Sequence, residues 1–239
     1  MKVFLLGATG NLGSRLVPAL LTHGHTVVAF VRSHSKLEHI LPPSTFEEIT
    51  VVEGDATNTK AVKEAILATN CDAVVTAAGV AAMAPWGKSD LPKIFRSVRD
   101  AVWQASEERG SALRVWFMAG IPMYPEHRGN LTLLEEMPAN AIEWSMLCPM
   151  TMNPESSDLS VPTKLSQGRL TASATVPPMW KRFWFSSLPL VGSFLAVAMN
   201  AGRYSVTTLE QNADLIATDL ETRHSQFVGK TVGVISVGK

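Results

Sequence analysis

Hydrophobic residues follow two alternating patterns over the first 150 residues of the chain. Short runs of β-branched and aliphatic residues predict strands, and apolar positions that recur every three or four residues predict helices between them. We expect strands at 2–6, 26–31, 49–53, 72–76, 113–117 and 142–147, and helices from about residue 12 onward and at 34–41, 59–68, 91–109 and 131–137. This alternation predicts an α/β fold with a parallel, doubly wound sheet.

The pattern loosens between residues 150 and 203, where Pro, Ser and Thr are frequent. Within this stretch, residues 183–202 contain no charged side chain, and their number would suffice for a membrane span. Pro189, Gly192 and Asn200 interrupt the run, however. We therefore expect a lid over an apolar pocket, or an interface helix, and no transmembrane span.

Regular patterns return near the end of the chain, where we expect a helix at 209–221 and a final strand at 231–237. No internal repeat or linker divides the sequence. We predict a single domain over residues 1–239, with residues 150–205 as a small lid-like, substrate-binding region within it.

The sequence GATGNLG, residues 7–13, places a glycine at every third position between the first strand and the first helix. Gly7 allows a tight exit from the strand, Gly10 lets the backbone approach a pyrophosphate, and Gly13 allows the helix to pack close to the sheet. The helix N-terminus adds free N–H groups that attract phosphates. This turn predicts a dinucleotide site, and its predicted contacts are Gly7, Thr9, Gly10, Asn11, Leu12 and Gly13.

The end of the second strand indicates which dinucleotide is bound. In NAD sites an acidic residue about 20 residues beyond the glycines holds the ribose hydroxyls. Here Arg32 stands 19 residues after Gly13 and is followed by Ser33, and no carboxylate lies between Ser14 and Glu38. An arginine can bind a 2′-phosphate through two hydrogen bonds, so the sequence predicts NADP(H) as the cofactor.

Three segments, GATGNLG, VRSHSKL and VVEGDATN, resemble the atypical short-chain dehydrogenase/reductase group, and in particular its NmrA-like branch, which is common in fungi. The helix LEQNADLIATDL is similar to the closing helix of that family. The resemblance covers most of the chain and implies a Rossmann fold. It also implies that residues at the end of the third strand contact the adenine. The turn after the fourth strand would lie along the cofactor, and a proline after the sixth strand would border the nicotinamide. The corresponding residues are Asp55, Ala56, Ala77, Ala78, Gly79 and Pro149.

The catalytic residues of the wider family have no direct counterparts here. Its reductases use a serine after the fifth strand and a Tyr-x-x-x-Lys motif on the next helix, whereas residues 117–120 are FMAG and the chain has no such motif. Tyr124 and Arg128 have the right spacing, but Pro125 keeps Tyr124 in a loop. Arg128 can supply a positive charge but no proton. The candidate groups are Tyr124, Glu126, His127 and Arg128, unless this is an ordinary exposed polar loop.

Large apolar side chains are frequent in the segments that follow the predicted strands. The ligand side of a doubly wound sheet is the edge at which the strands end, so these side chains are candidates for the walls of a substrate pocket. Methionine and tryptophan suit a pliable apolar pocket, although each one could equally be a core residue. The candidates are Met83, Trp86, Met118, Met123, Met150, Trp180 and Trp184.

Composition narrows the possible partners. Lysine plus arginine equals aspartate plus glutamate at 21 each, which argues against a nucleic-acid partner. Cys71 and Cys148 form no C-x-x-C pair and are expected to be reduced and packed, and we expect no metal site. The opening MKVFLLGATG reads as a strand and a turn, not as a signal peptide, so we expect a cytoplasmic protein.

Three functions fit these observations. The first is an NADP(H)-dependent reductase that acts on a small apolar molecule, with hydride supplied by the cofactor. The second is an isomerase or cyclase, such as the wider group contributes to secondary metabolism, in which bound NADP(H) shapes the pocket or supplies charge. The third is an NADP-sensing regulatory protein, as in the founding NmrA-type proteins. The missing serine and lysine favour substrates that need little proton transfer, or a cofactor that is not consumed.

Overall fold

The centre of the protein is a twisted eight-stranded sheet, seen in the computed structural model, which describes residues 1–79, 89–119, 125–149, 151–159, 170–173, 183–188, 192–201 and 206–236. The strand order in these residues is β3-β2-β1-β4-β5-β6-β10-β8, and all neighbours pair in parallel except β10 and β8. The strands are β1 Lys2–Leu6, β2 Thr26–Val31, β3 Thr50–Glu53, β4 Ala73–Thr76, β5 Arg114–Met118, β6 Glu143–Cys148, β8 Leu170–Ser173 and β10 Lys230–Ser236. The predicted doubly wound α/β fold is confirmed.

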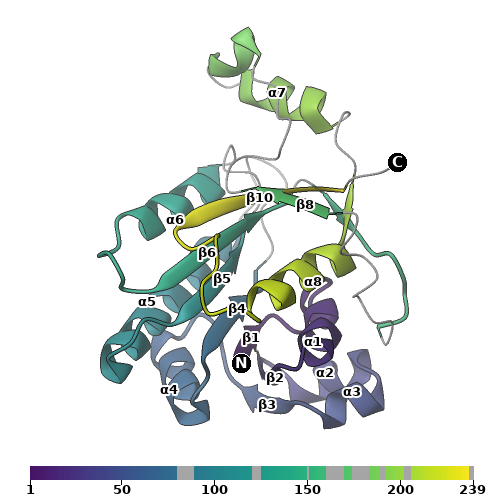
Figure 1. Ribbon diagram of the computed structural model, residues 1–239, viewed down its shortest axis with the longest axis vertical. Helices are drawn as coiled ribbons and strands as arrows, with labels where there is room; N and C mark the ends of the chain where they lie inside the picture. The colour runs from purple at the N-terminus through teal and green to yellow at the C-terminus, as the bar shows by residue number, and fades with distance from the viewer. Residues whose placement is uncertain are drawn as a thin grey trace.

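Helices cover both faces of the sheet (Figure 1). One layer contains α1, α2 and α8, and the other contains α4, α5 and α6. The helices are α1 Gly13–Thr22, α2 His34–Ile40, α3 Pro43–Glu47, α4 Thr59–Thr69, α5 Leu91–Arg109, α6 Pro125–Glu135, α7 Gly192–Ala201 and α8 Leu209–Asp219. Strand β1 shows how the core is divided, because Val3 and Leu5 pack on one layer while Phe4 and Leu6 pack on the other.

The carboxyl ends of the parallel strands meet at one edge, where the candidate site lies. Short polar caps fix the helices that begin there. Asn58 accepts a hydrogen bond from Ala61 N at the start of α4, and Thr208 and Gln211 form a capping box at the start of α8. These caps determine where each chain segment turns back from the sheet edge.

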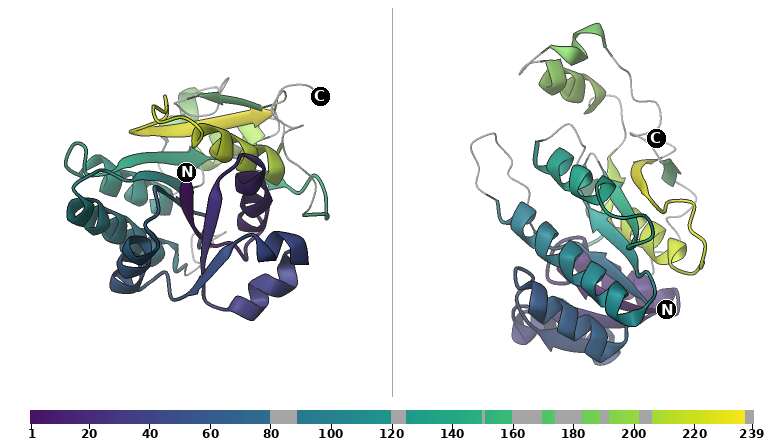
Figure 2. Two further views of the ribbon diagram at one scale, coloured as in Figure 1. Left: turned by 60° about the horizontal axis from the view of Figure 1, so that its bottom comes forward. Right: turned by 90° about the vertical axis from the view of Figure 1, so that its left-hand side faces the viewer.

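The region after residue 150 contains more regular structure than its composition predicts. Strand β8 joins the main sheet, and two short strands, β7 Met152–Asn153 and β9 Thr207–Thr208, pair in parallel. The 3-10 helix η3, Trp184–Ser187, packs against α7, and the right-hand view of Figure 2 shows this pair extending away from the body of the protein. No helix among the residues described here has the length and apolar character needed to cross a membrane.

One predicted helix boundary is wrong. The helix expected at 131–137 begins at Pro125, six residues earlier, and ends at Glu135. Glu126, His127 and Arg128 therefore belong to the first turn of α6 and not to a loop. The reason is that proline fits the first position of a helix, where its missing N–H has no intrahelical role.

Candidate dinucleotide site

The glycine turn between β1 and α1 is packed on two sides and open on the third. Gly7 has φ +85°, and a Cβ there would lie 2.6 Å from the backbone of Ala77 and Ala78. A Cβ on Gly13 would lie 2.0 Å from Gly7 O. Gly10 is exposed, and a Cβ there would meet Gly7 O alone, at 3.3 Å. Gly7 and Gly13 are thus required for packing, whereas Gly10 leaves room for a ligand to approach the backbone.

The turn holds the first amides of α1 at its open side. Gly10 N donates to Gly7 O at 2.9 Å, and Ser14 N donates to Gly10 O at 2.9 Å. Thr9 is half-buried and Asn11 is exposed, while Leu12 packs into the core. The positive end of the helix dipole therefore faces the same side as Gly10, which suits a diphosphate.

Arg32 stands exposed directly after β2, where a ribose would lie relative to the glycine turn. Ser33 caps α2, because its Oγ accepts a hydrogen bond from Lys36 N at 3.3 Å. Glu53, the last residue of β3, accepts a 2.6 Å hydrogen bond from His34 N, so this carboxylate binds the start of α2. The cations at this corner, Arg32 and Lys36, remain exposed to solvent.

The end of β3 brings Asp55 into the field of Arg32. Gly54 N donates to Val31 O at 2.8 Å, which holds the two strand ends together. Asp55 is exposed, and a hydrogen bond from Thr57 N at 2.8 Å, with the charges of Lys93 and Arg32, lowers its pKa. Asp55 is consequently an anionic acceptor. The adjacent Ala56 is half-buried against the core.

The ends of β4, β5 and β6 continue this edge. Ala77 N donates to Leu6 O at 2.9 Å, and Ala77 and Ala78 are half-buried beside the glycine turn. Gly79 has φ +105°, a conformation that side chains disfavour. Ala119 N donates to Leu147 O at 2.9 Å, and Pro149 is buried directly after β6. The structure thus brings the predicted cofactor contacts to one sheet edge, and their roles remain predictions.

The candidate catalytic groups are only partly described. Tyr124 lies outside the described residues. His127 is buried, with 4% of its surface exposed, in the first turn of α6, and Arg128 in the same turn is exposed. The alternative that this segment is an ordinary exposed polar loop does not hold for His127, because His127 is helical and its side chain is buried. Among the described residues, no cluster of His, Cys, Asp or Glu could hold a metal ion.

Only two of the seven predicted substrate contacts, Met118 and Trp184, lie within the described residues. The described structure omits Met83, Trp86, Met123, Met150 and Trp180. Met118, at the end of β5, is half-buried against the core beneath α1 and α8. Trp184 lies on η3, which packs against α7, and 86% of its surface is exposed. The structure therefore does not bring Trp184 and Met118 together.

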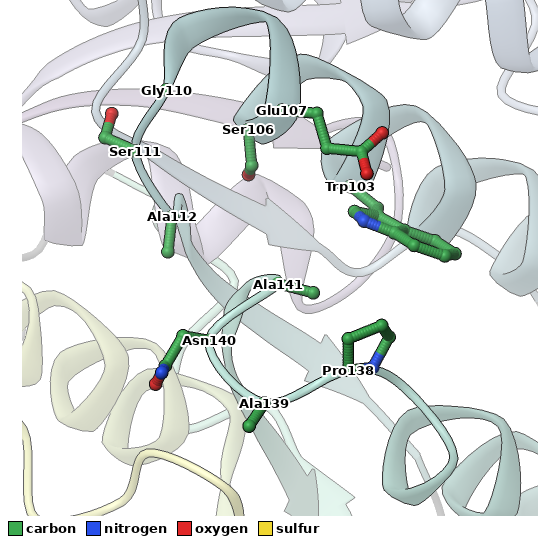
Figure 3. A pocket seen from close by; sticks show the side chains of 10 residues that line it. All are labelled: Trp103, Ser106, Glu107, Gly110, Ser111, Ala112, Pro138, Ala139, Asn140 and Ala141. Carbon is green, nitrogen blue, oxygen red and sulfur yellow. The ribbon is translucent and has the colours of Figure 1, made fainter.

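A cavity of about 300 Å³ opens at the opposite edge of the sheet (Figure 3). It lies between the end of α5 and the loop before β6, and Trp103, Glu107, Ser111 and Pro138 are among its lining residues. Ser111 and Pro138 precede β5 and β6, so the cavity sits at the amino ends of these strands. It is therefore separate from the dinucleotide site.

One contact of the glycine turn was not predicted. Arg15, in the first turn of α1, donates to Asn11 O at 3.1 Å and to Ser156 O at 3.0 Å. Its Nε donates to Glu210 Oε1 at 3.0 Å, and Glu210 Oε2 accepts from Glu155 N at 2.8 Å. This network joins the turn to α8 and to the segment after β6. The sequence holds no local signal for it, because Arg15 and Glu210 are 195 residues apart.

Comparisons with known proteins agree with this geometry. One similar structure, a Rossmann-fold NAD(P)-binding family protein from Shigella flexneri, is 18% identical with a TM-score of 0.64 over 100% of this chain and 95% of that one. A wide-type short-chain dehydrogenase/reductase from Veillonella parvula in complex with NADP is 14% identical, with a TM-score of 0.59 over 98% and 93%. An anaerobillin reductase from Escherichia coli is 13% identical, with a TM-score of 0.61 over 98% and 97%.

At these identities the solved structures show a shared fold, and no curated protein matches the chain. The sequence profile described as NAD(P)H-binding matches residues 7–158, which include the glycine turn, Arg32, Asp55 and the end of β6. This match agrees with the predicted class of cofactor. The chain therefore belongs to the NAD(P)H-binding family.

Proposed function

We propose that this protein is an NADP(H)-dependent oxidoreductase that transfers hydride between the nicotinamide and a small, largely apolar substrate. The observation that carries the proposal is Arg32, an exposed cation at the end of β2 where NAD-specific sites hold a carboxylate. Hydride chemistry comes from the cofactor, and the protein supplies binding and orientation. Within the family, the three segments around Gly10, Arg32 and Asp55 support a place in the atypical short-chain dehydrogenase/reductase group near its NmrA-like branch.

Charge at the ribose corner supports NADP(H) over NAD(H). A 2′-phosphate would add a double negative charge close to Arg32 and Lys36. Glu53, the neighbouring carboxylate, is hydrogen bonded to His34 N and so is already engaged. The ribose diol of NAD would meet a cation where it needs an acceptor, whereas the phosphate would be neutralised.

The cofactor would extend from this corner across the glycine turn. In the proposal, the diphosphate meets the amides of residues 9–13, the adenine lies near Asp55 and Ala56, and the nicotinamide lies near Pro149. Substrate would then bind between the ends of β4, β5 and β6. Met118 is the described member of that predicted pocket, and Trp184, exposed on η3, stays a predicted contact.

Proton transfer would fall to groups around the start of α6. Strand β5 ends in Met118 and is followed by Ala119, so no hydroxyl stands where the wider family has serine. We propose His127 and Tyr124 as the groups that move a proton, with Arg128 adding positive charge. The missing serine and lysine equally favour a second function, an isomerase or cyclase that keeps its NADP(H) unchanged.

Calorimetric titration with NADPH and NADH tests the cofactor proposal. We expect tighter binding of NADPH, and loss of most of that preference in Arg32→Ala. Arg223→Ala, another exposed arginine, is the control and should keep it. Equal affinities for the two cofactors, or a preference that survives Arg32→Ala, would contradict the proposal.

The reaction type needs a separate measurement. A small molecule that co-purifies with the protein would be identified by mass spectrometry and incubated with the enzyme and NADPH. An oxidoreductase consumes one NADPH for each product molecule, whereas an isomerase leaves the NADPH absorbance unchanged. A Tyr124→Phe/His127→Ala double variant with a preserved melting temperature should lose turnover, and unchanged turnover would remove both residues from the mechanism.

A further inference from the structure

Four of the five large apolar side chains that are strongly exposed in the described residues lie within one short segment. Trp184 is 86% exposed, Leu188 51%, Leu195 44%, Met199 50% and Val206 42%. The first four lie on η3, directly after it or on α7, and we call residues 183–188 and 192–201 the apolar hairpin. Exposed apolar groups that gather in one place indicate a binding surface.

The apolar hairpin is a folded unit and not a loose loop. Leu188 N donates to Phe185 O at 3.0 Å, and Gly192 N donates to Leu188 O at 3.1 Å. A Cβ on Gly192 would lie 1.9 Å from Phe185 O, so α7 approaches η3 as closely as glycine permits. The rings of Phe183 and Phe185 stack with centroids 5.1 Å apart. The exposed side chains are therefore displayed by a defined backbone.

Charge in the surrounding sequence is strongly asymmetric. Residues 159–209 contain five basic residues and no acidic residue, and two of the five, Lys181 and Arg182, directly precede the hairpin in the sequence. The remainder of the chain has 16 basic and 21 acidic residues. The apolar segment is thus cationic, while the rest of the protein is net anionic.

We propose that the apolar hairpin binds the surface of a bilayer that contains anionic phospholipids. Leu195 and Met199, one helical turn apart on α7, would enter the boundary between headgroups and acyl chains. The basic residues that flank the hairpin in the sequence would attract the lipid phosphates. Helix α7 has 10 residues and spans only about 15 Å, so it lies in the plane of the interface and does not cross.

A second copy of the chain fits this surface less well. A symmetric dimer would place the same cationic segment on both sides of its two-fold axis, and like charges would face each other. An anionic membrane instead neutralises the segment and repels the net negative remainder of the chain. Binding would therefore be restricted to the hairpin.

Co-sedimentation with phosphatidylcholine vesicles, with and without phosphatidylserine, tests the proposal. We expect binding that requires phosphatidylserine and weakens as salt is raised. Leu195→Ser/Met199→Ser should lower the partition coefficient by about tenfold or more, because two half-exposed apolar side chains no longer leave water. Val206→Ser, which changes an exposed apolar side chain outside the hairpin, should bind like the parent chain.

Melting temperature and NADPH affinity should be the same in all variants, since neither position contacts the dinucleotide site. No sedimentation with phosphatidylserine vesicles would overturn the proposal, as would equal binding by the Leu195→Ser/Met199→Ser variant. Sedimentation velocity without lipid tests the alternative that a second copy of the chain binds the hairpin. A dimer that this double variant dissociates would assign the hairpin to a second copy of the chain and overturn membrane binding.

Discussion

Gly10 and Gly13 stand three residues apart, and the same substitution should affect two different properties at these positions. A Cβ on Gly13 would lie 2.0 Å from Gly7 O, more than 1 Å inside ordinary contact, so the turn and α1 would have to separate. We expect Gly13→Ala to lower the free energy of unfolding by about 1–3 kcal/mol or more. A Cβ on Gly10 would lie 3.3 Å from Gly7 O, so Gly7 O would have to move by only a few tenths of an ångström. Gly10→Ala should keep the parent melting temperature.

The methyl group of Gly10→Ala would instead occupy the open side of the turn, where the diphosphate is proposed to approach the backbone. We expect NADPH affinity to fall at least tenfold, which corresponds to about 1.4 kcal/mol. Calorimetry measures that loss, and thermal unfolding without cofactor measures stability. Gly129→Ala is the control, because Gly129 is an exposed helical glycine with open space around it, so alanine should stabilise slightly. Parent-like NADPH binding by Gly10→Ala would refute the placement of the diphosphate.

Three further predictions concern stability and reactivity. Burial raises the pKa of Cys71, and that of Cys148 to about 12, so neither thiol should react with a maleimide at neutral pH until denaturant is added. Asp219→Ala would leave the buried guanidinium of Arg114 without the carboxylate that lies 2.6 Å away, and should lower the free energy of unfolding in urea by about 3–5 kcal/mol. Glu108→Ala, which breaks the more exposed ion pair with Lys63, should lower it by less than about 1 kcal/mol. Burial also lowers the pKa of His25 below 6.5, and the unfolded chain therefore takes up this proton first as the pH falls. Its contribution to stability should be complete above pH 6.5 and decline below it, and a His25→Gln variant should show a smaller drop in urea midpoint over that range.

Local signals account for the elements that the sequence predicted well. The strand at 26–31 and the helix at 91–109 have the same bounds in the structure. Strand β2 is a run of aliphatic and aromatic residues that buries five of its six positions, and α5 ends at Gly110 in the left-handed conformation that glycine adopts most easily. In both segments the residues that define the ends lie within the element or next to it.

Strand β8, which depends on a distant partner, was not predicted, and helix α7 was expected only as one of two alternatives for residues 183–202. Strand β8 has the sequence LTAS, which carries little strand pattern, and it is stabilised by antiparallel pairing with β10, where Ala172 faces Val234. Helix α7 follows a stretch rich in Pro and Ser, and its close contact with η3 depends on the backbone of Phe185. Such pairings cannot be derived from hydrophobic period alone, because the partner supplies the missing hydrogen bonds.

Functional and buried polar residues also differ in how well the sequence predicts their surroundings. The glycine turn, Arg32 and Asp55 follow strands directly, so parallel topology alone brings them to one edge. Arg114 is different, since the side-chain oxygens that accept hydrogen bonds from this buried arginine at the start of β5 lie far away in the sequence. It donates to Asp219 and Ser145, which lie 105 and 31 residues away, and the ring of Trp116 lies 5.1 Å from its guanidinium. Long-range polar networks of this kind require the folded structure.

The ion pair between Arg15 of α1 and Glu210 of α8 has an electrostatic consequence for cofactor binding. Glu210 lies beside the first turn of α1, and an unpaired carboxylate there would oppose the binding of a diphosphate to the helix N-terminus. Arg15 neutralises it at 3.0 Å, and both side chains are nearly buried, with 12% and 8% of their surfaces exposed. Because Arg15 also donates to Asn11 O, the same side chain holds the turn in shape. The closing helix would therefore contribute to the proposed dinucleotide site through this pair, although α8 lies outside residues 7–158, which match the family profile.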